Sequence, residues 1–379
     1  MTLNMNTRLV NYTSEHTTQM GAKEWNIADV TDSVLVTLSD NLPGGWHFDN
    51  FTEDHMVAKD SGGFQLLMDP SLANGFDVEG LIARHMEVGF GPNDTIISAD
   101  FPIPRRDGIS NEETLQRQKT SKAWYDQMKA KIPLTVPVVH GRTAEDIEAH
   151  LEMYELDETE GVCIGSNLAQ AKPRVYDHLK KGGQVKDTTK RPSTTELWLE
   201  AIPMMKAVRN NERSIFLLGA GGMNAAPIAA LLGADAVDAT SWRLNAMMRK
   251  IFCSDHGRYI RLGVKPNYEE EWSKTFLQER LQDDHYPFAG MTFEELIRAF
   301  QLEGAAGTEV CKLHNIYEMD RDAKRVSEYE GDPDGLASML EDRFHSTWKD
   351  HANLKVLRAA LASVKSDATG DGNFSNYKR

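Results

Sequence analysis

The chain has 379 residues, and its 57 Asp and Glu against 42 Lys and Arg give a formal net charge of −15. This charge argues against nucleic-acid binding by the whole surface, although it is compatible with one local basic groove. The sequence has no apolar run of membrane-spanning length, no signal peptide pattern, and only three scattered cysteines. We therefore expect a cytoplasmic protein that does not enter a membrane.

Short apolar runs alternate with stretches of helical periodicity along most of the chain. Strands are predicted in TIISAD (95–100), LTVPVVHG (134–141), GVCIGSN (161–167), SIFLLGAGG (214–222) and ADAVDATS (234–241). Helices are predicted at 111–130, 143–156, 194–210 and 223–233, with Thr143 as an N-cap. This alternation predicts βαβ units with a parallel sheet, and the chain length suits an α/β fold of the (β/α)8 TIM barrel type.

The C-terminal third has a different character. From Asn267 onward the pattern is helical and acidic. We predict a catalytic barrel over residues 1–266, with a basic insertion at about 171–192, and a helical subdomain over 267–365 that completes it. Residues 366–379 read as a disordered tail.

Polar residues and glycines gather where the predicted strands end. The stretch VAKDSGGFQLLMD (57–69) places Asp60, two glycines and an aromatic behind one strand, and Asp100, His140 and Asp238 follow others. The local reading is a tight turn in which Asp60 or Ser61 caps the next segment. The functional reading is a ligand site. Carboxylates without a metal cluster are typical of acid/base and nucleophilic chemistry, as in glycosyl transfer.

A second class of function is open at this point. SIFLLGAGGMNAAPIAALLGADAVDA reads as strand, GAGG turn, helix and strand, with Asp238 standing 19 residues after Gly219. This order is similar to a dinucleotide fingerprint and would suit a nicotinamide-dependent oxidoreductase. The third glycine position is Asn224, however, so the fingerprint is imperfect.

Several motifs in register favour the glycosyl-transfer reading. DSGGFQ (60–65) resembles the signature of the tRNA-guanine transglycosylases, which are built on a (β/α)8 barrel. Segments similar to other motifs of that family follow in its order: ISADFPIP (97–104), VPVVHGRTAEDIE (136–148), GVCIGSNLAQA (161–171), FLLGAGG (216–222), GADAVDATSWR (233–243), the hairpin KIFCSDHGRYIRL (250–262) and CKLHNIY (311–317). The resemblance covers about residues 30 to 320, and in its features it is closest to the DNA-guanine transglycosylases of phages and bacteria.

The resemblance implies a role for each matching residue. Asp238 is the expected nucleophile, which attacks C1′ of the nucleotide and leaves a covalent glycosyl-enzyme. Asp60 is the expected general acid/base. Asp100 is expected to accept hydrogen bonds from guanine, and His140, in place of the family's Gln, to donate to its O6. The other expected base-binding residues are Phe64, Gly165, Ser166, Leu218 and Gly219.

The metal site of that family is altered here. Its cysteine cluster corresponds to residues near 276–290, which contain no cysteine. His314 stands at the place of the family's zinc histidine. An altered structural zinc site could use Cys311, His314 and His285, and a helix without metal is the alternative.

The expected substrates follow from two further departures. The family's Glu that suits an aminomethyl group is replaced by Ala171, which favours the neutral 7-cyano-7-deazaguanine as the incoming base. The basic insertion and the lost cysteine cluster favour DNA over tRNA as the nucleic-acid partner. The expected contacts to nucleic acid are Arg243, Lys180, Lys181 and Arg258. A helper protein or a homodimer is a further expected partner, and a catalytically silent family member is the remaining alternative.

Overall fold

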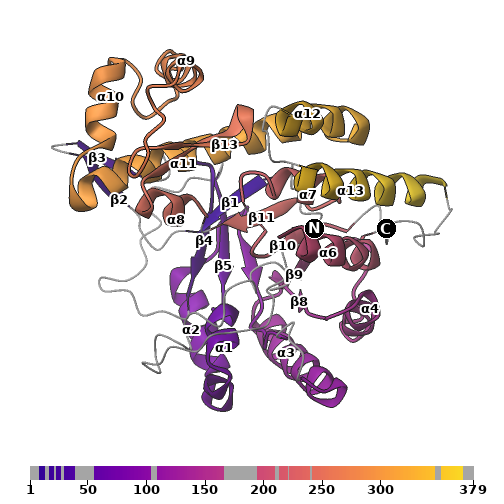
Figure 1. Cartoon of the computed structure of the whole chain (residues 1–379). Coiled ribbons are helices and arrows are strands. Elements are labelled where there is room, and N and C mark those ends of the chain that lie inside the picture. The colour runs from indigo at the N-terminus through magenta and orange to yellow at the C-terminus, as the bar shows by residue number, and fades with distance from the viewer. Residues whose placement is uncertain are drawn as a thin grey trace, which may run out of the picture.

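The computed structural model describes residues 8–12, 17–20, 23–26, 30–38, 55–103, 109–165, 194–209, 213–220, 222–239, 241–345 and 351–369. Its centre is a parallel sheet whose strand order is β7-β6-β5-β4-β1-β11-β10-β9-β8 (Figure 1). The strands are β1 (Arg8–Tyr12), β4 (Ser33–Thr37), β5 (Met56–Asp60), β6 (Thr95–Ile97), β7 (Thr135–Val136), β8 (Val138–Val139), β9 (Val162–Ile164), β10 (Ile215–Leu217) and β11 (Ala236–Ala239). The predicted mixed α/β architecture with parallel strands is confirmed.

The two strands at the ends of this order are neighbours in the chain. Only Pro137 separates β7 from β8, so the strand predicted over 134–141 is two short strands. Proline has no amide hydrogen and interrupts a strand ladder. The amide of Ser98 donates to the Val136 carbonyl at 2.9 Å, and the amide of Cys163 donates to the Pro137 carbonyl at 2.8 Å. One short run of chain is therefore bonded to both β6 and β9.

Helices lie around the strands (Figure 1). They are α1 (Gly63–Met68), α2 (Val78–Val88), α3 (Asn111–Lys131), α4 (Ala144–Glu152), α6 (Thr194–Val208), α7 (Ala226–Leu231) and α8 (Ser241–Met247), with a 3-10 turn η2 (Pro70–Gly75). The predicted N-cap is confirmed, because Thr143 Oγ1 accepts a hydrogen bond from the Asp146 amide at 3.1 Å. Such a cap satisfies one of the free amides of the first helical turn.

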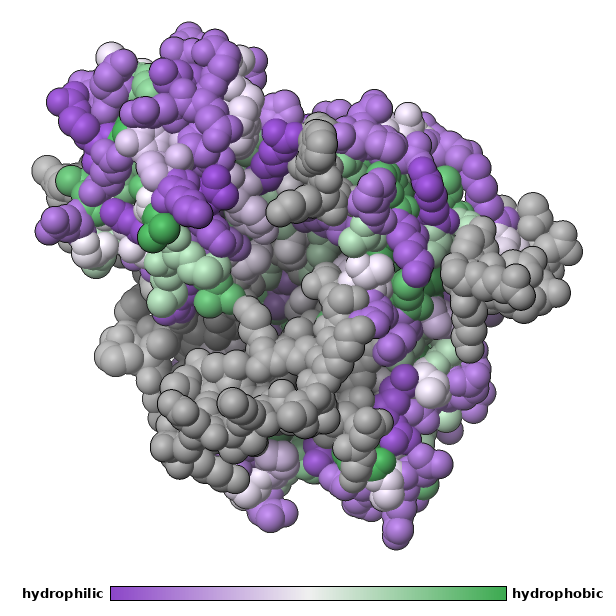
Figure 2. Space-filling view, in the orientation of Figure 1, coloured by the Kyte–Doolittle hydropathy of each residue, from purple (hydrophilic) through white to green (hydrophobic). Residues whose placement is uncertain are grey.

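The C-terminal part is helical, as its sequence predicts. A hairpin of β12 (Lys250–Cys253) and β13 (Arg258–Arg261), joined by η4 (Ser254–His256), precedes α9 (Glu271–Arg280), α10 (Phe293–Phe300), α11 (Gly304–Ser327), α12 (Pro333–His345) and α13 (His351–Thr369). In the view of Figure 2 the surface over α9, α10 and α12 is mainly hydrophilic. No described helix is long and apolar enough to cross a bilayer.

Two terminal features differ from the prediction. Helix α13 continues to Thr369, so residues 366–369 are helical rather than part of a disordered tail. Lys206 of α6 donates to the Ser366 hydroxyl at 3.4 Å, which holds this turn against the neighbouring helix. Near the N-terminus, the sequence predicted neither β1 nor the hairpin of β2 (Thr17–Met20) and β3 (Lys23–Asn26).

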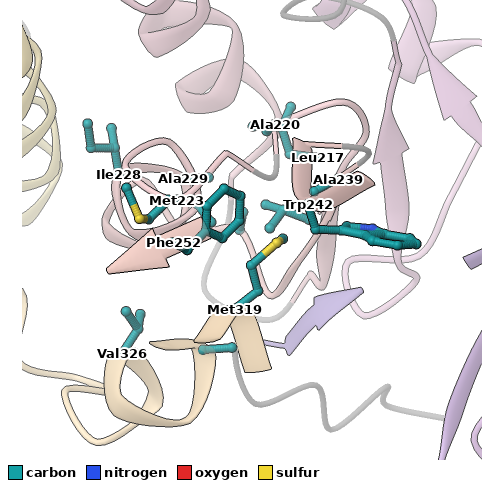
Figure 3. Packing of buried hydrophobic residues seen from close by; sticks show 14 of the residues in the cluster. Leu217, Ala220, Met223, Ile228, Ala229, Ala239, Trp242, Phe252, Met319 and Val326 are labelled. Carbon is teal, nitrogen blue, oxygen red and sulfur yellow. The ribbon is translucent and has the colours of Figure 1, made fainter. Parts of the chain in front are cut away.

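The sheet has a buried inner face. One hydrophobic cluster joins side chains from every strand of the sheet except β1: Leu35, Met56, Ala58, Ile97, Val136, Val138, Cys163, Phe216 and Ala236. We call it the inner cluster. A larger cluster includes Leu217 of β10 together with Trp242, Phe252 and Met319, and it joins the sheet to α11 and the hairpin (Figure 3). This packing fixes the strand ends on which the site is built.

Candidate active site

The candidate site is one layer of side chains above the inner cluster. Alternate residues of a strand point to the same face of a sheet. On every strand of the inner cluster except β6, the residue two positions beyond it therefore shares its face at the carboxyl end: Thr37, Asp60, His140, Gly165, Leu218 and Asp238. On β6 the alternation breaks, because Ala99 packs in another cluster. We call this set the upper layer. Parallel-sheet enzymes place their chemistry at the carboxyl ends of strands, and the upper layer lies there.

Asp60 is held by its own turn and by the adjacent strand. Its Oδ2 accepts a hydrogen bond from the Gly62 amide at 3.0 Å and one from Thr37 Oγ1 at 3.3 Å. Gly62 has φ of 86°, a left-handed conformation that glycine adopts without strain. Burial, then the charges of Asp100 and Asp238, raise the pKa of Asp60 to about 7. A carboxyl with this pKa can give or take a proton near neutral pH.

Asp238 stands on β11 with a backbone donor. The Gly219 amide donates to its Oδ1, and this bond favours the ionised form. Burial acts in the opposite direction and is larger, so the pKa of Asp238 is raised to about 6. Gly219 is the first glycine of the GAGG turn, and its φ of 77° is a left-handed conformation that glycine adopts without strain. In this conformation its amide donates to the Asp238 carboxylate. Helix α7 begins only at Ala226.

Asp100 and His140 form a buried pair. Oδ2 of Asp100 lies 2.6 Å from Nε2 of His140, and the two residues are 4% and 1% exposed. Ser61 Oγ lies 3.5 Å from Asp100 Oδ1 and donates more closely, at 3.1 Å, to the Ser98 carbonyl. A Cβ on Gly63 would stand 2.2 Å from Asp100 Oδ1. Both carboxylate oxygens therefore face protein groups.

The backbone of His140 is fixed from behind. Its amide donates to Nδ1 of His150 at 2.9 Å, and its carbonyl accepts from Gln118 Nε2 at 3.0 Å. Because Nδ1 of His150 accepts, its proton is on Nε2, which lies 3.1 Å from the Tyr154 hydroxyl. Burial lowers the pKa of His150 to about 3, which is consistent with this neutral ring.

Gly165 packs against the ring of His140. A Cβ at this position would stand 2.1 Å from Cε1 of His140, so only glycine fits beside the ring. Leu218 is half-buried at the edge of the inner cluster. For Phe64 the structure describes the backbone at the start of α1, and Ser166 lies outside the described residues.

The expected nucleic-acid contacts are only partly described. Arg243 lies in α8, directly after the strand that carries Asp238. Arg258 lies in β13, with its guanidinium 5.5 Å from the centre of the Trp272 ring. Lys180 and Lys181 lie outside the described residues.

The expected zinc ligands do not come together. Nδ1 of His314 lies 2.7 Å from the Tyr286 hydroxyl, and Nε2 lies 2.8 Å from the Phe252 carbonyl, so both ring nitrogens have partners. Cys311 is buried and His285 is exposed. Among the described residues there is no group of three His, Cys, Asp or Glu side chains that could hold a metal ion.

A separate cavity of about 910 Å³ lies at the other end of the strands. Thr31, Asp32 and His55 border it just before β4 and β5 begin, together with residues of α11. In parallel α/β folds this end contributes to stability, and the chemistry is placed at the opposite end. We therefore place the candidate site at the upper layer.

Sequence reasoning missed several residues that support the site. Thr37 could have been found, because it lies two residues beyond Leu35 in the strand SVLVT, on the same face, and pairs in register with Asp60. Ser61 and Gly63 lie within the quoted motif, but their contact with Asp100 is not local. His150 and Tyr154 lie one helical turn apart in and after α4, and nothing in their spacing points to the backbone of His140.

No protein-family model matches the sequence, and no curated protein matches it. The function of the chain must therefore be inferred from its own motifs and from the geometry of the upper layer.

Proposed function

We propose that the chain is a transferase that exchanges guanine in DNA for a 7-deazaguanine through a covalent aspartyl-glycosyl intermediate. The observation that carries this proposal is the pair Asp60 and Asp238 in the upper layer, each held by the backbone amide of a glycine: Gly62 donates to Asp60 Oδ2 at 3.0 Å, and Gly219 donates to Asp238 Oδ1. Burial raises the pKa of both carboxyl groups above the ordinary value, so near neutral pH one of them can be ionised while the other carries a proton. One nucleophile and one general acid are the two groups that a retaining displacement requires.

The reaction then follows two displacements at one carbon. An oxygen of Asp238 forms a bond to C1′ as the glycosidic bond breaks, and the electron pair of that bond goes to the guanine ring nitrogen. Asp60 supplies the proton that guanine needs to leave. The incoming base gives its ring proton to Asp60 and attacks C1′, which releases Asp238 and restores the protonated Asp60. Two inversions give overall retention.

We propose that the strands close as a (β/α)8 barrel around this site. The hydrogen bonds of residues 135–139 to both β6 and β9 support closure, because the two ends of the strand order are then one run of chain. The inner cluster supports it too, since it joins side chains from both halves of that order. The C-terminal helices form the subdomain that completes the barrel.

The substrates are proposed from the resemblance and from local chemistry. DNA is the proposed nucleic acid, with Arg243, Arg258, Lys180 and Lys181 as contacts to its phosphates. The proposed incoming base is 7-cyano-7-deazaguanine. An enzyme that acts on a base within a duplex must turn it out of the stack, so a single-stranded substrate should react more readily than a duplex.

The test is an exchange assay with radiolabelled guanine, in which duplex DNA, single-stranded DNA and tRNA are offered in parallel. Asp238→Asn should abolish incorporation. Asp235→Asn is the matched control, because Asp235 is a partly buried Asp just before β11, at the opposite end of that strand, where it accepts from the Ile215 amide. Incorporation into tRNA alone would replace DNA as the partner. No incorporation with any of the three would overturn the proposal.

A further inference from the structure

One residue of the segment after β10 has no role in the proposed reaction. Asn224 stands at the third glycine position of the GAGG motif. Its side-chain amide donates to the carbonyl of Gly257 at 3.3 Å, across 33 positions of the chain. Gly257 lies between η4 and β13, in the turn of the hairpin. The segment after β10 is therefore joined to a turn outside the parallel sheet.

The same turn is in contact with α12. A Cβ on Gly257 would stand 2.9 Å from Oδ1 of Asn224 and 3.2 Å from Cγ of Arg343. Arg343 is 3% exposed, and its guanidinium donates to both carboxylate oxygens of Asp322 in α11. Nη1 of this guanidinium also lies 3.5 Å from the carbonyl of Met223. We call Met223, Asn224, Gly257 and Arg343 the clamp.

Apolar packing holds the segment at the same place. Met223 and Ala220 are 3% and 2% exposed. Both belong to the larger hydrophobic cluster, together with Phe252 of β12 and Met319 of α11 (Figure 3). Polar contacts and packing thus fix the segment after β10 against the hairpin and the C-terminal helices.

The clamped segment carries the backbone donor of Asp238. The amide of Ala225 donates to the Gly222 carbonyl at 2.8 Å, and the amide of Gly222 donates to the Ala220 carbonyl at 2.9 Å. Gly219, the residue before Ala220, donates its amide to Oδ1 of Asp238. A displacement at the clamp is therefore passed through these short backbone contacts to the amide that holds the carboxylate.

We propose that Asn224 and Arg343 are positioning residues for Asp238, and that they act through the amide of Gly219. The clamp fixes this amide, and the amide fixes one oxygen of the carboxylate, so the nucleophile keeps one orientation. A misplacement of about 1 Å can cost about 100-fold in rate. The catalytic part of this inference rests on the proposed function. The structural part, that the clamp sets the position of the Gly219 amide, does not.

The first experiment needs no activity. The protein is labelled with [1-¹³C]leucine and [¹⁵N]glycine on a deuterated background, and an amide NMR spectrum is selected for glycines that follow leucine. The sequence has three such glycines, Gly219, Gly233 and Gly263. Leu218→Met removes the ¹³C label before Gly219 and so assigns its signal. The other two signals are internal references.

Gly257→Ala and Asn224→Ala both disturb the clamp. The first adds a Cβ between Asn224 and Arg343, and the second removes the hydrogen bond to the hairpin turn. An amide that donates to a carboxylate makes a short, charge-assisted hydrogen bond, so its proton signal lies downfield. We expect the Gly219 signal to move upfield in both variants, and further than either reference signal.

Two controls match the chemistry of these changes. Gly331→Ala matches Gly257→Ala, since φ is 77° at Gly331 and 60° at Gly257, but a Cβ on Gly331 meets nothing within 4 Å. Asn245→Ala matches Asn224→Ala, because Asn245 also donates to a backbone carbonyl, that of Ser241, at 2.8 Å. Neither control should move the signal. If the clamp only stabilised the fold, its variants would unfold more easily with the signal unmoved, and the inference would be overturned.

The exchange reaction tests the catalytic part. Both clamp variants should lower kcat at least about tenfold and change KM for the base less than about threefold, because they misplace the nucleophile and leave the base-binding residues in place. An unchanged kcat with a moved Gly219 signal overturns the catalytic part. If the wild-type protein exchanges no base in any nucleic acid, the proposed function fails, and the NMR spectra still decide the structural part.

If Gly257→Ala does not fold, Asn224→Ala and Arg343→Lys take its place. Lysine keeps a cation beside Asp322 but has a single nitrogen instead of the fork that also approaches the Met223 carbonyl. The same upfield movement of the Gly219 signal is expected, and an unmoved signal in both variants overturns the inference.

Discussion

Gly63 and Asp100 lie so close together that a Cβ on residue 63 would stand 2.2 Å from the carboxylate oxygen Oδ1. The two glycines of DSGGFQ thus have different tasks. Gly62 provides the left-handed turn, with φ of 86°, and Gly63 provides space for a neighbouring side chain. Two adjacent glycines in a sequence suggest a flexible segment, but here each of them is required by the local geometry.

Gly63→Ala tests this contact. Residue 63 is the first residue of α1, where alanine is otherwise a better helix former than glycine. The clash should nevertheless destabilise the protein by about 1–3 kcal/mol, because the side chain of Asp100 or the start of the helix must move. Urea unfolding measures the change. Gly75→Ala is the control, since a Cβ there meets nothing within 4 Å. Equal effects of the two substitutions would contradict the contact.

Asp60→Asn should stabilise the folded protein in a pH-dependent way. The pKa of Asp60 is about 7 in the folded protein, against an ordinary value of 3.8, so the folded state binds this proton more tightly. Ionising the group therefore opposes folding. The cost is absent below about pH 4 and complete above about pH 7.

We expect Asp60→Asn to raise the free energy of unfolding by about 4 kcal/mol near pH 8 and to leave it unchanged near pH 4. Denaturant melts at the two pH values measure this difference. Glu145→Gln is a control for the loss of an acidic side chain, because Glu145 is exposed in the first turn of α4. A gain of the same size at both pH values would mean that charge is not its cause.

The edge at which the candidate site residues lie could be predicted from the sequence. Strands alternate with helices, so polar residues at successive strand ends lie at one edge, where Thr37 donates to Asp60 and the Gly219 amide donates to Asp238. The pairing of Asp100 with His140 could not be predicted. It depends on the fixed backbone of His140 and on the space beside Gly165, which come from elements distant in the chain.

Strand β1 is a part of the fold that could not be predicted from the sequence. Its sequence, RLVNY, is short, and its apolar residues do not alternate regularly with polar ones. It becomes a central strand because β4 and β11 pair with it on both sides. Long-range pairing of this kind is invisible to local periodicity.

Glu318→Ala should be strongly destabilising. Glu318 is fully buried in α11, accepts from Arg280 Nε at 2.5 Å, and accepts from the Ser254 hydroxyl at 2.6 Å. Removing it leaves a buried cation and a buried hydroxyl with fewer partners, at a cost of about 3–5 kcal/mol. The matched control is Asp126→Ala, which breaks an exposed pair with Lys122 and should cost less than about 1 kcal/mol. Thermal unfolding of both variants decides.

Tyr286→Phe tests the assignment of His314 to a hydrogen-bond network. The substitution removes the hydroxyl that lies 2.7 Å from Nδ1 and should lower stability by about 1–2 kcal/mol, with no change in zinc content. Tyr268→Phe is the control, because its hydroxyl accepts an exposed hydrogen bond from Gln301. A higher zinc content in Tyr286→Phe would show that a freed His314 nitrogen binds the metal.

The pair Lys59–Asp94 affects the register of β5 in the sheet. Lys59 is 3% exposed and faces away from the upper layer, while Asp60, the next residue, faces into it. A slip of one residue would exchange their faces. The ammonium group would then enter the carboxylate layer, and the carboxylate would replace the cation beside Asp94. Two like charges would meet on one face, and Asp60 would be lost from the upper layer on the other. On the face of Asp94, a buried ion pair would thus be replaced by two like charges, so the Lys59–Asp94 pair opposes a one-residue misalignment of this strand in addition to apolar packing.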